Sequence, residues 1–253
     1  MSTNFPKIPH ACIFDVDDTL ISNYYPDGRG MHETARYEAM QLIGHQPGKE
    51  ALLGINEQEN HEVVHIAPQH TMESITWTLL HAHGLVDGLE IDKTNELLQE
   101  IISIKNRLYT EKLKRDGKEV PGAKVFLQYL HQNDIKLAIA SGAYLKDIQI
   151  DLEIIGVSDI FQSKHIKALG SYTKPKPSPE PFIVALHSLG LDGSEQNIWA
   201  FEDDTRGIRS AQDAGLRVCA LTSRYTEAVL TPYLKPDDIL IQDYNDLMQR
   251  LGL

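Results

Sequence analysis

The stretch that decides the fold is residues 11–20, ACIFDVDDTL. Its first four residues are apolar and predict a short buried strand that ends at Phe14. Two carboxylates follow at once, Asp15 and Asp17, and ligands of open α/β sheets bind just beyond such strand ends. Buried acids this close repel one another unless a cation or a shared proton neutralises them. The stretch therefore suits a nucleophile, a proton donor and a divalent cation, although a capped turn without chemistry is the alternative.

Composition limits the class of protein. The chain has 253 residues, of which 42% are hydrophobic and 24% charged, as in an ordinary globular protein of one large domain or a core with an insertion. A net charge of −12 argues against a nucleic-acid partner. No apolar run approaches the ~18 residues of a membrane span, and the first residues do not resemble a signal peptide. Cys12 and Cys219 lie in apolar runs, so we expect core cysteines in a cytoplasmic protein.

Strand-like and helix-like segments alternate from about residue 120 to the end of the chain. The expected strands are 135–140, 197–201, 216–221 and 238–242, and the expected helices include 123–131, 144–155 and one that Ser178 caps. This alternation is typical of a parallel sheet with helices on both faces. The sequence therefore predicts an α/β protein with a Rossmann-like parallel sheet.

A helical block interrupts the alternation after the first strand. Helical spacing covers residues 31–43, about 71–83 and 92–115, with almost no strand-like run among them. We therefore predict an α/β core formed by residues 1–21 and 116–253, and an inserted α-helical cap formed by residues 22–115. The cap is expected to lie over the carboxyl edge of the sheet.

Two further strand ends carry groups suited to an anion. Ser141 and Gly142 follow the strand 135–140, so a hydroxyl and backbone N–H groups could hold a phosphoryl oxygen. The run 174–177, KPKP, offers Lys174 and Lys176 in a stiff segment that would aim an ammonium at a fixed point. The alternatives are simple helix capping by Ser141 and a solvated loop lysine.

A fourth strand end is acidic again. Glu202, Asp203 and Asp204 follow the strand 197–201. Magnesium takes oxygen ligands and keeps several waters, so Asp15, the carbonyl of Asp17 and Asp203 would suffice for a site, with Glu202 as a further candidate ligand. Capping of the helix that starts at Thr205 is the alternative.

In this order the four strand ends resemble the motifs of the haloacid dehalogenase-like hydrolase superfamily, in the subgroup with a helical cap after the first motif. Residues 15–19, DVDDT, match its Asp-x-Asp-x-Thr motif, and Ser141 matches the second motif. Residues 176–182, KPSPEPF, resemble the third, which Lys176 fits better than Lys174, although both lysines stay open. Residues 201–207, FEDDTRG, match the fourth, with Asp204 where serine is common.

The resemblance implies a role for each group. Asp15 would attack phosphorus and form an aspartyl-phosphate, and Asp17 would protonate the leaving alkoxide and then activate water. Ser141 and Lys176 would stabilise charge on the transferred oxygens, and Mg²⁺ would orient nucleophile and substrate. The expected function is Mg²⁺-dependent hydrolysis of a small phosphorylated metabolite. Dehalogenation is disfavoured, because a leaving halide needs no acid such as Asp17.

Three other functions remain open. A phosphomutase resembling β-phosphoglucomutase uses the same core, so the cap decides between mutase and phosphatase. Residues 61–65, HEVVH, spell a zinc-protease motif in which His61 and His65 would bind metal and Glu62 would act as base, but Pro68 would shorten the helix. A binding protein without catalysis is disfavoured, because no motif residue is missing.

Two residues of the predicted cap are candidate substrate contacts. His32 lies where capped relatives often place a histidine that faces the site, and Arg36 would share its helix face. An exposed polar face is an equally good interpretation of this pair. The sequence names neither the substrate nor the oligomeric state.

Overall fold

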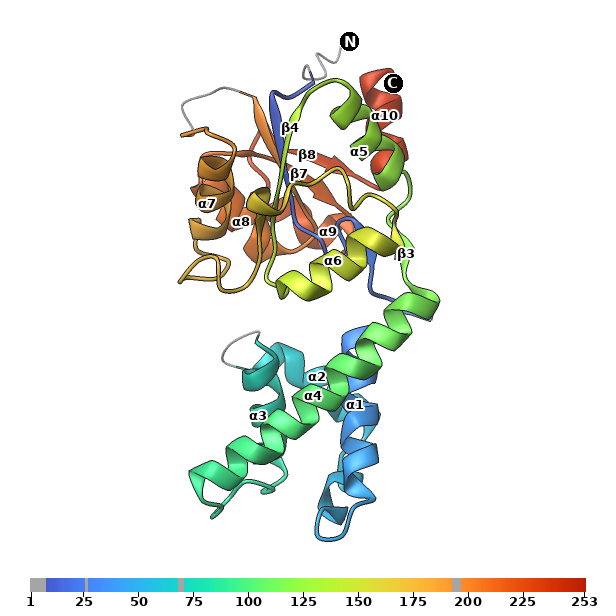
Figure 1. The fold of residues 1–253 in the computed structure, drawn as a ribbon, viewed down its shortest axis with the longest axis vertical. Helices are drawn as coiled ribbons and strands as arrows, with labels where there is room; N and C mark the ends of the chain where they lie inside the picture. Colours follow the sequence, from blue (N-terminus) through green and yellow to red (C-terminus); the bar gives the residue numbers. More distant parts are fainter. Residues whose placement is uncertain (1–7, 26, 68–70, 193–196) are drawn as a thin grey trace. The chain divides into compact units, whose positions relative to one another are not determined.

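The computed structural model describes residues 8–25, 27–67, 71–192 and 197–253. The chain divides into two compact units, one formed by the chain up to Ser22 together with Gly117–Leu253, and the other by Asn23–Asp116. The first unit contains the main sheet, and the elements described in the second unit are all helices, as Figure 1 shows. No helix among the described residues is long and apolar enough to cross a membrane.

A six-stranded sheet forms the centre of the first unit, in the order β5-β4-β1-β6-β7-β8, and every pair of neighbours is parallel. The strands are β1 (Ala11–Phe14), β4 (Lys136–Ala140), β5 (Ile166–Lys167), β6 (Ile198–Glu202), β7 (Arg217–Leu221) and β8 (Ile239–Ile241). In the register, Phe14 of β1 lies opposite Ile139 of β4 and Phe201 of β6. The residues that follow Phe14, Ile139 and Phe201 therefore reach the carboxyl edge of the sheet at one level.

The two faces of the sheet have different cores because successive side chains of a strand point to opposite sides. One face carries aliphatic residues such as Ile13, Ala138 and Ala200, which pack with apolar residues of α7 (Glu180–Ser188) and α8 (Thr205–Asp213). The other face carries aromatic rings, with Phe14 and Phe201 stacked at 4.5 Å. The helices α5 (Ala123–Gln132) and α10 (Tyr244–Leu251) add Phe126 and Tyr244 to this cluster.

The remaining helical elements of this unit connect strands in the sequence. They are α6 (Leu145–Ile154), η2 (Ser163–His165), α9 (Glu227–Leu230) and η3 (Thr231–Tyr233). Two short strands, β2 (Ile21–Ser22) and β3 (Lys118–Glu119), pair antiparallel at the point where the chain leaves and re-enters the unit. The Val120 N–H also donates to the Leu20 carbonyl at 2.9 Å. The two connections are therefore tied to each other by backbone hydrogen bonds.

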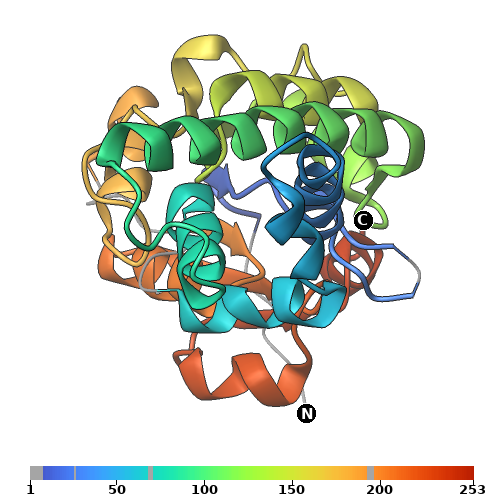
Figure 2. The ribbon, with the colours of Figure 1, turned by 90° about the horizontal axis from the view of Figure 1, so that it is seen from below.

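The helical unit contains α1 (Met31–Gly44), η1 (Glu50–Gly54), α2 (Glu57–Ile66), α3 (Met72–Ala82) and α4 (Ile91–Asp116). Helices α1 and α4 make the most extensive contact in this unit, and Figures 1 and 2 show α4 as its longest helix. The core of the helical unit contains apolar side chains from all five of these helices, among them Met40, Leu52, Val63, Leu79 and Ile101. Each unit thus buries a separate hydrophobic cluster.

The prediction of an α/β fold with a parallel sheet and an inserted helical block is confirmed. The expected strands and helices begin and end within a residue or two of the observed ones. The start of α7 differs slightly from the prediction that Ser178 caps this helix, because Pro179 is the N-cap and the helix begins at Glu180. The Ser178 hydroxyl still accepts a hydrogen bond from the Glu180 N–H at 3.3 Å.

Candidate active site

The first motif continues the sheet for one residue and then turns. The Asp15 N–H donates to the Phe201 carbonyl at 3.0 Å, so the main chain of Asp15 is fixed by the neighbouring strand β6. The side chain of Asp15 is nearly buried, whereas Asp17 is partly exposed. Asp18 adopts a left-handed φ of 57°, which aspartate tolerates better than most residues. This turn brings both Asp15 and Asp17 to the carboxyl edge of the sheet.

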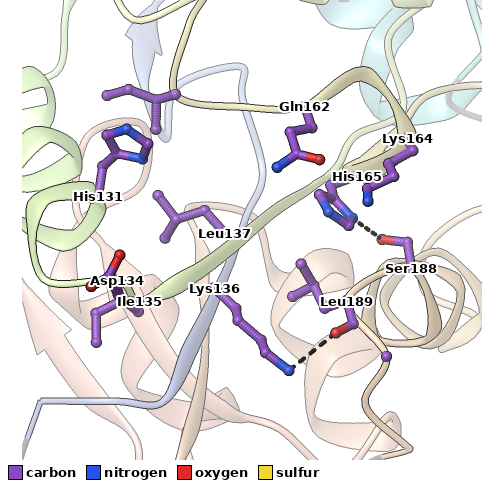
Figure 3. A pocket seen from close by; sticks show the side chains of 12 residues that line it. His131, Asp134, Ile135, Lys136, Leu137, Gln162, Lys164, His165, Ser188 and Leu189 are labelled. Carbon is purple, nitrogen blue, oxygen red and sulfur yellow. Dashed lines mark hydrogen bonds between the residues drawn. The ribbon is translucent and has the colours of Figure 1, made fainter.

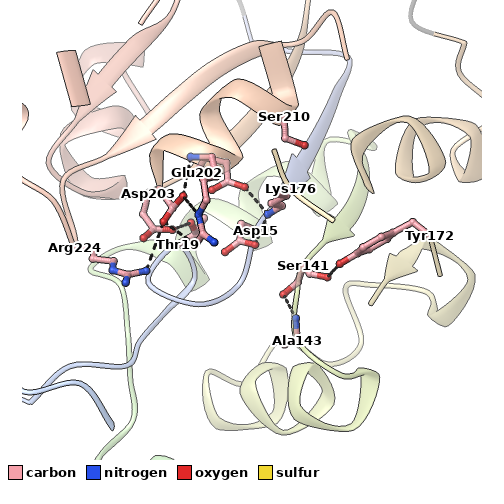
Figure 4. Close-up of polar contacts among 12 residues, drawn as sticks. Asp15, Thr19, Ser141, Ala143, Tyr172, Lys176, Glu202, Asp203, Ser210 and Arg224 are labelled. Carbon is pink, nitrogen blue, oxygen red and sulfur yellow. Dashed lines mark hydrogen bonds and ion pairs between the residues drawn. The ribbon is translucent and has the colours of Figure 1, made fainter. Parts of the chain in front are cut away.

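Lys176 joins two acids that come from different strand ends. Its Nζ lies 2.6 Å from Asp15 Oδ1 and 2.5 Å from Glu202 Oε1 (Figure 4). The same atom lies 5.1 Å from the centre of the Phe182 ring. Burial works to lower the pKa of Lys176, but the charges of Asp15 and Glu202 outweigh it and raise that pKa. Lys176 is therefore held as a cation directly beside the Asp15 carboxylate.

Lys174 has different surroundings. It is exposed, and its backbone N–H donates to a Glu180 carboxylate oxygen at 2.9 Å. The Thr173 N–H and hydroxyl donate to the same carboxylate at 2.8 and 3.0 Å. These bonds fix the main chain just before Lys176. The geometry thus favours Lys176 over Lys174 as the lysine of the acid cluster.

Asp203 and Glu202 complete this cluster. Asp15, Glu202 and Asp203 each offer a carboxylate oxygen within 4.8 Å of the other two. The Thr19 hydroxyl donates to Asp203 Oδ1 at 3.1 Å, while buried Asp203 Oδ2 has no hydrogen-bond partner among the residues that the structure describes. Burial, followed by the charges of Asp18 and Asp15, raises the pKa of Asp203. Three crowded oxygen donors with one unsatisfied oxygen fit a hard divalent cation.

Gly207 explains how Glu202 fits beside α8. A Cβ atom at position 207 would lie 2.1 Å from the carboxyl carbon of Glu202. Glycine at this position therefore lets the first turn of α8 approach the buried Glu202 side chain.

Asp204 has a structural role in this arrangement. Its side chain caps α8 by accepting from the Arg206 N–H at 2.7 Å, and it also binds the Arg206 side chain at 3.0 Å. Arg224, on the loop that follows β7, lies 3.7 Å from the same carboxylate. Burial acts to raise the pKa of Asp204, but the hydrogen bonds and charges of the arginines prevail and lower it. The capping alternative therefore describes Asp204, while Asp203 belongs to the acid cluster.

Ser141 lies at the end of β4, on the same edge as Asp15 and Lys176 (Figure 4). The residue is buried, and its Oγ accepts from the Ala143 N–H at 3.1 Å. Gly142 is exposed. The turn 141–143 thus presents a hydroxyl and backbone groups beside the acid cluster, and its use for phosphate stays a prediction.

Sequence reasoning missed Tyr172. Its hydroxyl donates to the carbonyl oxygen of Ser141 at 2.9 Å. It stands only four residues before Lys176, but no spacing rule distinguishes it from an ordinary loop tyrosine.

The two candidate residues of the helical unit make contacts inside that unit. The His32 ring stacks on Tyr109 at 3.8 Å, and its Nδ1 lies 2.8 Å from Lys105 Nζ. Arg36 is only 1% exposed, and its Nε donates to Asn60 Oδ1 at 2.7 Å. Burial lowers the pKa of Arg36 to about 10. Arg36 therefore joins α1 to α2, and substrate contact by His32 or Arg36 remains a prediction.

The HEVVH motif lies on α2. His61 Nδ1 is 2.6 Å from Glu33 Oε2, and Glu62 accepts a hydrogen bond from Gln58 at 2.8 Å. The side chain of His65 and all of Pro68 lie outside the described residues. Among the residues that are described, His61 belongs to no group of three that could hold a metal.

A pocket of about 420 Å³ opens at the amino end of β4, away from the acid cluster (Figure 3). It is lined by His131, Lys136, Lys164 and His165 among others. Two of these polar groups are occupied, because Lys136 Nζ donates to the Leu189 carbonyl at 3.2 Å and His165 Nδ1 lies 3.2 Å from the Ser188 hydroxyl. None of the residues that line this pocket belongs to the acid cluster, and neither Ser141 nor Lys176 is among them.

Comparisons with known proteins identify the family of this chain. The haloacid dehalogenase-like hydrolase family matches residues 9–215, and the chain belongs to that family. The chain is 32% identical over 118 residues to the Drosophila melanogaster protein named "Probable pseudouridine-5'-phosphatase", with 44% of this chain and 49% of that protein covered. It is 28% identical over 128 residues to the pyrophosphatase PpaX of Oceanobacillus iheyensis, with 50% and 56% covered. The matches thus span about half the length of these relatives.

Solved structures agree on the fold. A haloacid dehalogenase hydrolase from Entamoeba histolytica superposes with a TM-score of 0.72 at 22% identity, covering 95% of this chain and 96% of the other. The β-phosphoglucomutase of Clostridium difficile superposes with a TM-score of 0.65 at 21% identity, covering 95% and 93%. Both likenesses extend through the sheet and the helical block.

Proposed function

We propose that this protein is a Mg²⁺-dependent phosphatase that hydrolyses the phosphomonoester of a small metabolite through an aspartyl-phosphate on Asp15. The observation that carries the proposal is the contact of Lys176 with Asp15 and Glu202, in a cluster whose third acid is Asp203. Its parts come from three segments far apart in sequence, namely the ends of β1 and β6 and the loop that precedes α7. Buried charges assembled at such cost in desolvation are typical of functional sites.

Asp15 is the proposed nucleophile. One of its carboxylate oxygens forms a bond to phosphorus, and the bond from phosphorus to the ester oxygen breaks with its electron pair on that oxygen. Lys176, 2.6 Å from Oδ1, fixes the direction of the carboxylate. This orientation is what an in-line attack on phosphorus needs.

Asp17 is the proposed general acid and base. It follows Asp15 by two residues at the same edge, and it is partly exposed, so both substrate and water can reach it. It gives its proton to the leaving alkoxide in the first step. In the second step it takes a proton from the water that attacks phosphorus, which releases inorganic phosphate and restores Asp15.

Ser141, Gly142 and Lys176 are the proposed ligands of the phosphoryl oxygens. The Ser141 hydroxyl and the backbone N–H of Gly142 supply neutral donors, and Lys176 supplies a positive charge. Donors that are already fixed in place stabilise the charge that builds up on these oxygens in the transition state.

The acid cluster is the proposed magnesium site. Asp15, Asp203 and Glu202, together with the carbonyl of Asp17, would hold the ion. When bound, the ion would offset the repulsion among these acids and the charge of the phosphate. Asp203 Oδ2 supports this assignment, because it has no hydrogen-bond partner in the described part of the chain.

The helical unit, Asn23–Asp116, is the proposed cap that selects the substrate, with His32 as its candidate contact. The similarity to phosphatases of small phosphorylated compounds supports this class of substrate.

The test is release of phosphate from an aryl phosphate and a panel of phosphorylated metabolites, measured with Mg²⁺ and with EDTA. Asp15→Asn purified in parallel is the control for contaminating phosphatases. We expect release by the natural protein with Mg²⁺ only. Equal rates in EDTA contradict the metal assignment, and no release from any ester contradicts the phosphatase. Isomerisation of a sugar phosphate without release of phosphate identifies a mutase instead.

A further inference from the structure

The hydroxyl of Tyr172 makes a contact that the proposed chemistry does not yet use. It donates to the carbonyl oxygen of Ser141 at 2.9 Å, across 31 residues of sequence (Figure 4). The tyrosine side chain comes from the loop between β5 and α7 and is half-buried. It therefore joins the loop that leads to Lys176 to the turn that follows β4.

The Ser141 carbonyl belongs to the same peptide unit as the Gly142 N–H. A trans peptide is planar, and its C=O and N–H point in opposite directions. A hydrogen bond that holds the carbonyl therefore also sets the direction of the Gly142 N–H. This is the N–H that the proposed function assigns to a phosphoryl oxygen.

Glycine at position 142 makes this restraint necessary. With no Cβ, glycine leaves the flanking peptides freer to rotate than any other residue does. Main-chain hydrogen bonds fix the turn on both sides of this peptide. Before it, the Ser141 N–H donates to the Lys167 carbonyl at 3.0 Å, and after it, the Ala143 carbonyl accepts from the Leu169 N–H at 2.8 Å. The contact from Tyr172 holds the peptide between those two bonds.

The base of Tyr172 is itself fixed. The next two residues, Thr173 and Lys174, donate their N–H groups to Glu180 in the first turn of α7 at 2.8 and 2.9 Å. The pKa of Tyr172 is raised, mainly by burial; the charge of Lys176 acts to lower this pKa and the charge of Asp15 acts to raise it. The phenol is therefore close enough to both charged groups to interact with them. One short segment thus places Tyr172 and Lys176 together.

We propose that Tyr172 is a positioning residue that orients the Ser141–Gly142 peptide, so that the Gly142 N–H and the Ser141 hydroxyl meet the phosphoryl oxygens beside Lys176. The inference rests on the proposed function, because the anion that it serves is the phosphoryl group. Tyr172 acts through the peptide and does not itself touch substrate.

The test compares Tyr172→Phe with the natural protein. This substitution removes one hydroxyl and keeps the ring. With Mg²⁺ present, we expect kcat/KM for an aryl phosphate to fall about three- to tenfold, the range for the loss of one net hydrogen bond. The Kd for inorganic phosphate, measured by calorimetry, should rise by a similar factor. The thermal unfolding midpoint should stay near that of the natural protein. Tyr233→Phe, at a half-exposed tyrosine in η3, is the matched control and should change none of the three.

Unchanged phosphate affinity in Tyr172→Phe overturns the inference, whether or not the melting temperature falls. If the natural protein binds phosphate but hydrolyses no ester, the proposed function fails, and the change in phosphate affinity still decides the role of Tyr172. If the natural protein neither binds phosphate nor hydrolyses esters, both proposals are overturned.

Discussion

The carboxyl edge of the sheet and the helical unit use their charged residues in different ways. At the edge, contacts join residues far apart in sequence, such as Lys176 with Asp15 across 161 positions and Thr19 with Asp203 across 184. In the helical unit, charged side chains bind residues of other helices in the same unit, as buried Arg36 binds Asn60 across 24 positions and Lys105 binds His32 across 73.

The difference shows where a sequence motif is informative. Parallel strands bring their carboxyl ends to one edge of the sheet. Polar residues at these ends therefore lie close together, independent of the conformation of the loops. Helices meet through side-chain packing, and a polar residue on a helix finds partners that the sequence does not specify. We therefore expect substitutions at the sheet edge to affect chemistry, and many in the helical unit to affect stability first.

The largest effect is expected at Asp15. Asp15→Asn keeps the size of the side chain but removes the nucleophile, so turnover of an aryl phosphate should fall by about three orders of magnitude or more. Circular dichroism should show a folded protein. The exposed Asp159→Asn is the control and should retain full activity. Substantial activity in Asp15→Asn would remove the sheet edge from the mechanism.

The next effect separates the two lysines. Lys176→Ala removes the cation beside Asp15 and should lower kcat by about 10²–10³, as for other preorganised donors. Lys174→Ala changes an exposed side chain of the same segment and should have little effect. Steady-state kinetics decide the order, and the reverse ranking would show that the motif begins at Lys174.

A smaller effect is expected in the helical unit. Arg36→Ala leaves buried polar groups of Asn60 without their partner and should lower the free energy of unfolding by about 1–3 kcal/mol. His32→Ala should instead change the ranking of phosphate esters. Denaturant titration and a substrate panel, run on both variants, distinguish the two roles. Normal stability together with altered ranking in Arg36→Ala would reverse this assignment.

The last effect is a pH dependence of stability, and it concerns Asp151 on α6. It is 1% exposed, and neither carboxylate oxygen has a hydrogen-bond partner within the described parts of the chain. Burial, together with the charges of Asp17, Asp147 and Asp15, raises the pKa of Asp151 to about 9. Since the unfolded chain ionises near 3.9, the folded protein should lose stability as the pH rises from about 4 towards 9.

Asp151→Asn cannot ionise and should escape this loss. The unfolding midpoint of the variant, relative to the natural protein, should therefore increase between pH 5 and pH 8. Asp159→Asn serves as the exposed control. Parallel pH profiles for the Asp151 variant and the natural protein would contradict the buried, protonated carboxyl.

Much of the fold and of the edge was predictable from the sequence. Apolar runs that end in polar residues indicated β1, β4 and β6, and their parallel order placed Asp15, Ser141 and Asp203 together. Strand β5 was missed because two residues carry no periodicity, and the β2–β3 pair depends on two segments that meet only in space.

The other residues of the site could be assigned only from side-chain contacts in the structure. The motif pattern favoured Lys176 but left both lysines open, and the distance from Lys176 Nζ to Asp15 decides between them. Tyr172 became visible through one hydrogen bond to a backbone carbonyl. For Arg36, helical spacing gave the correct helix but not its burial against Asn60.

The most direct test of the central claim is to locate the covalent phosphoryl group. The protein is mixed with substrate and Mg²⁺, quenched in acid within the first turnovers and reduced with borohydride, which converts an aspartyl-phosphate to homoserine. Peptide mapping by mass spectrometry then finds the modified position. The account predicts homoserine at position 15 and none in Asp15→Asn. Modification at another residue, or release of phosphate with no modified residue, would contradict it.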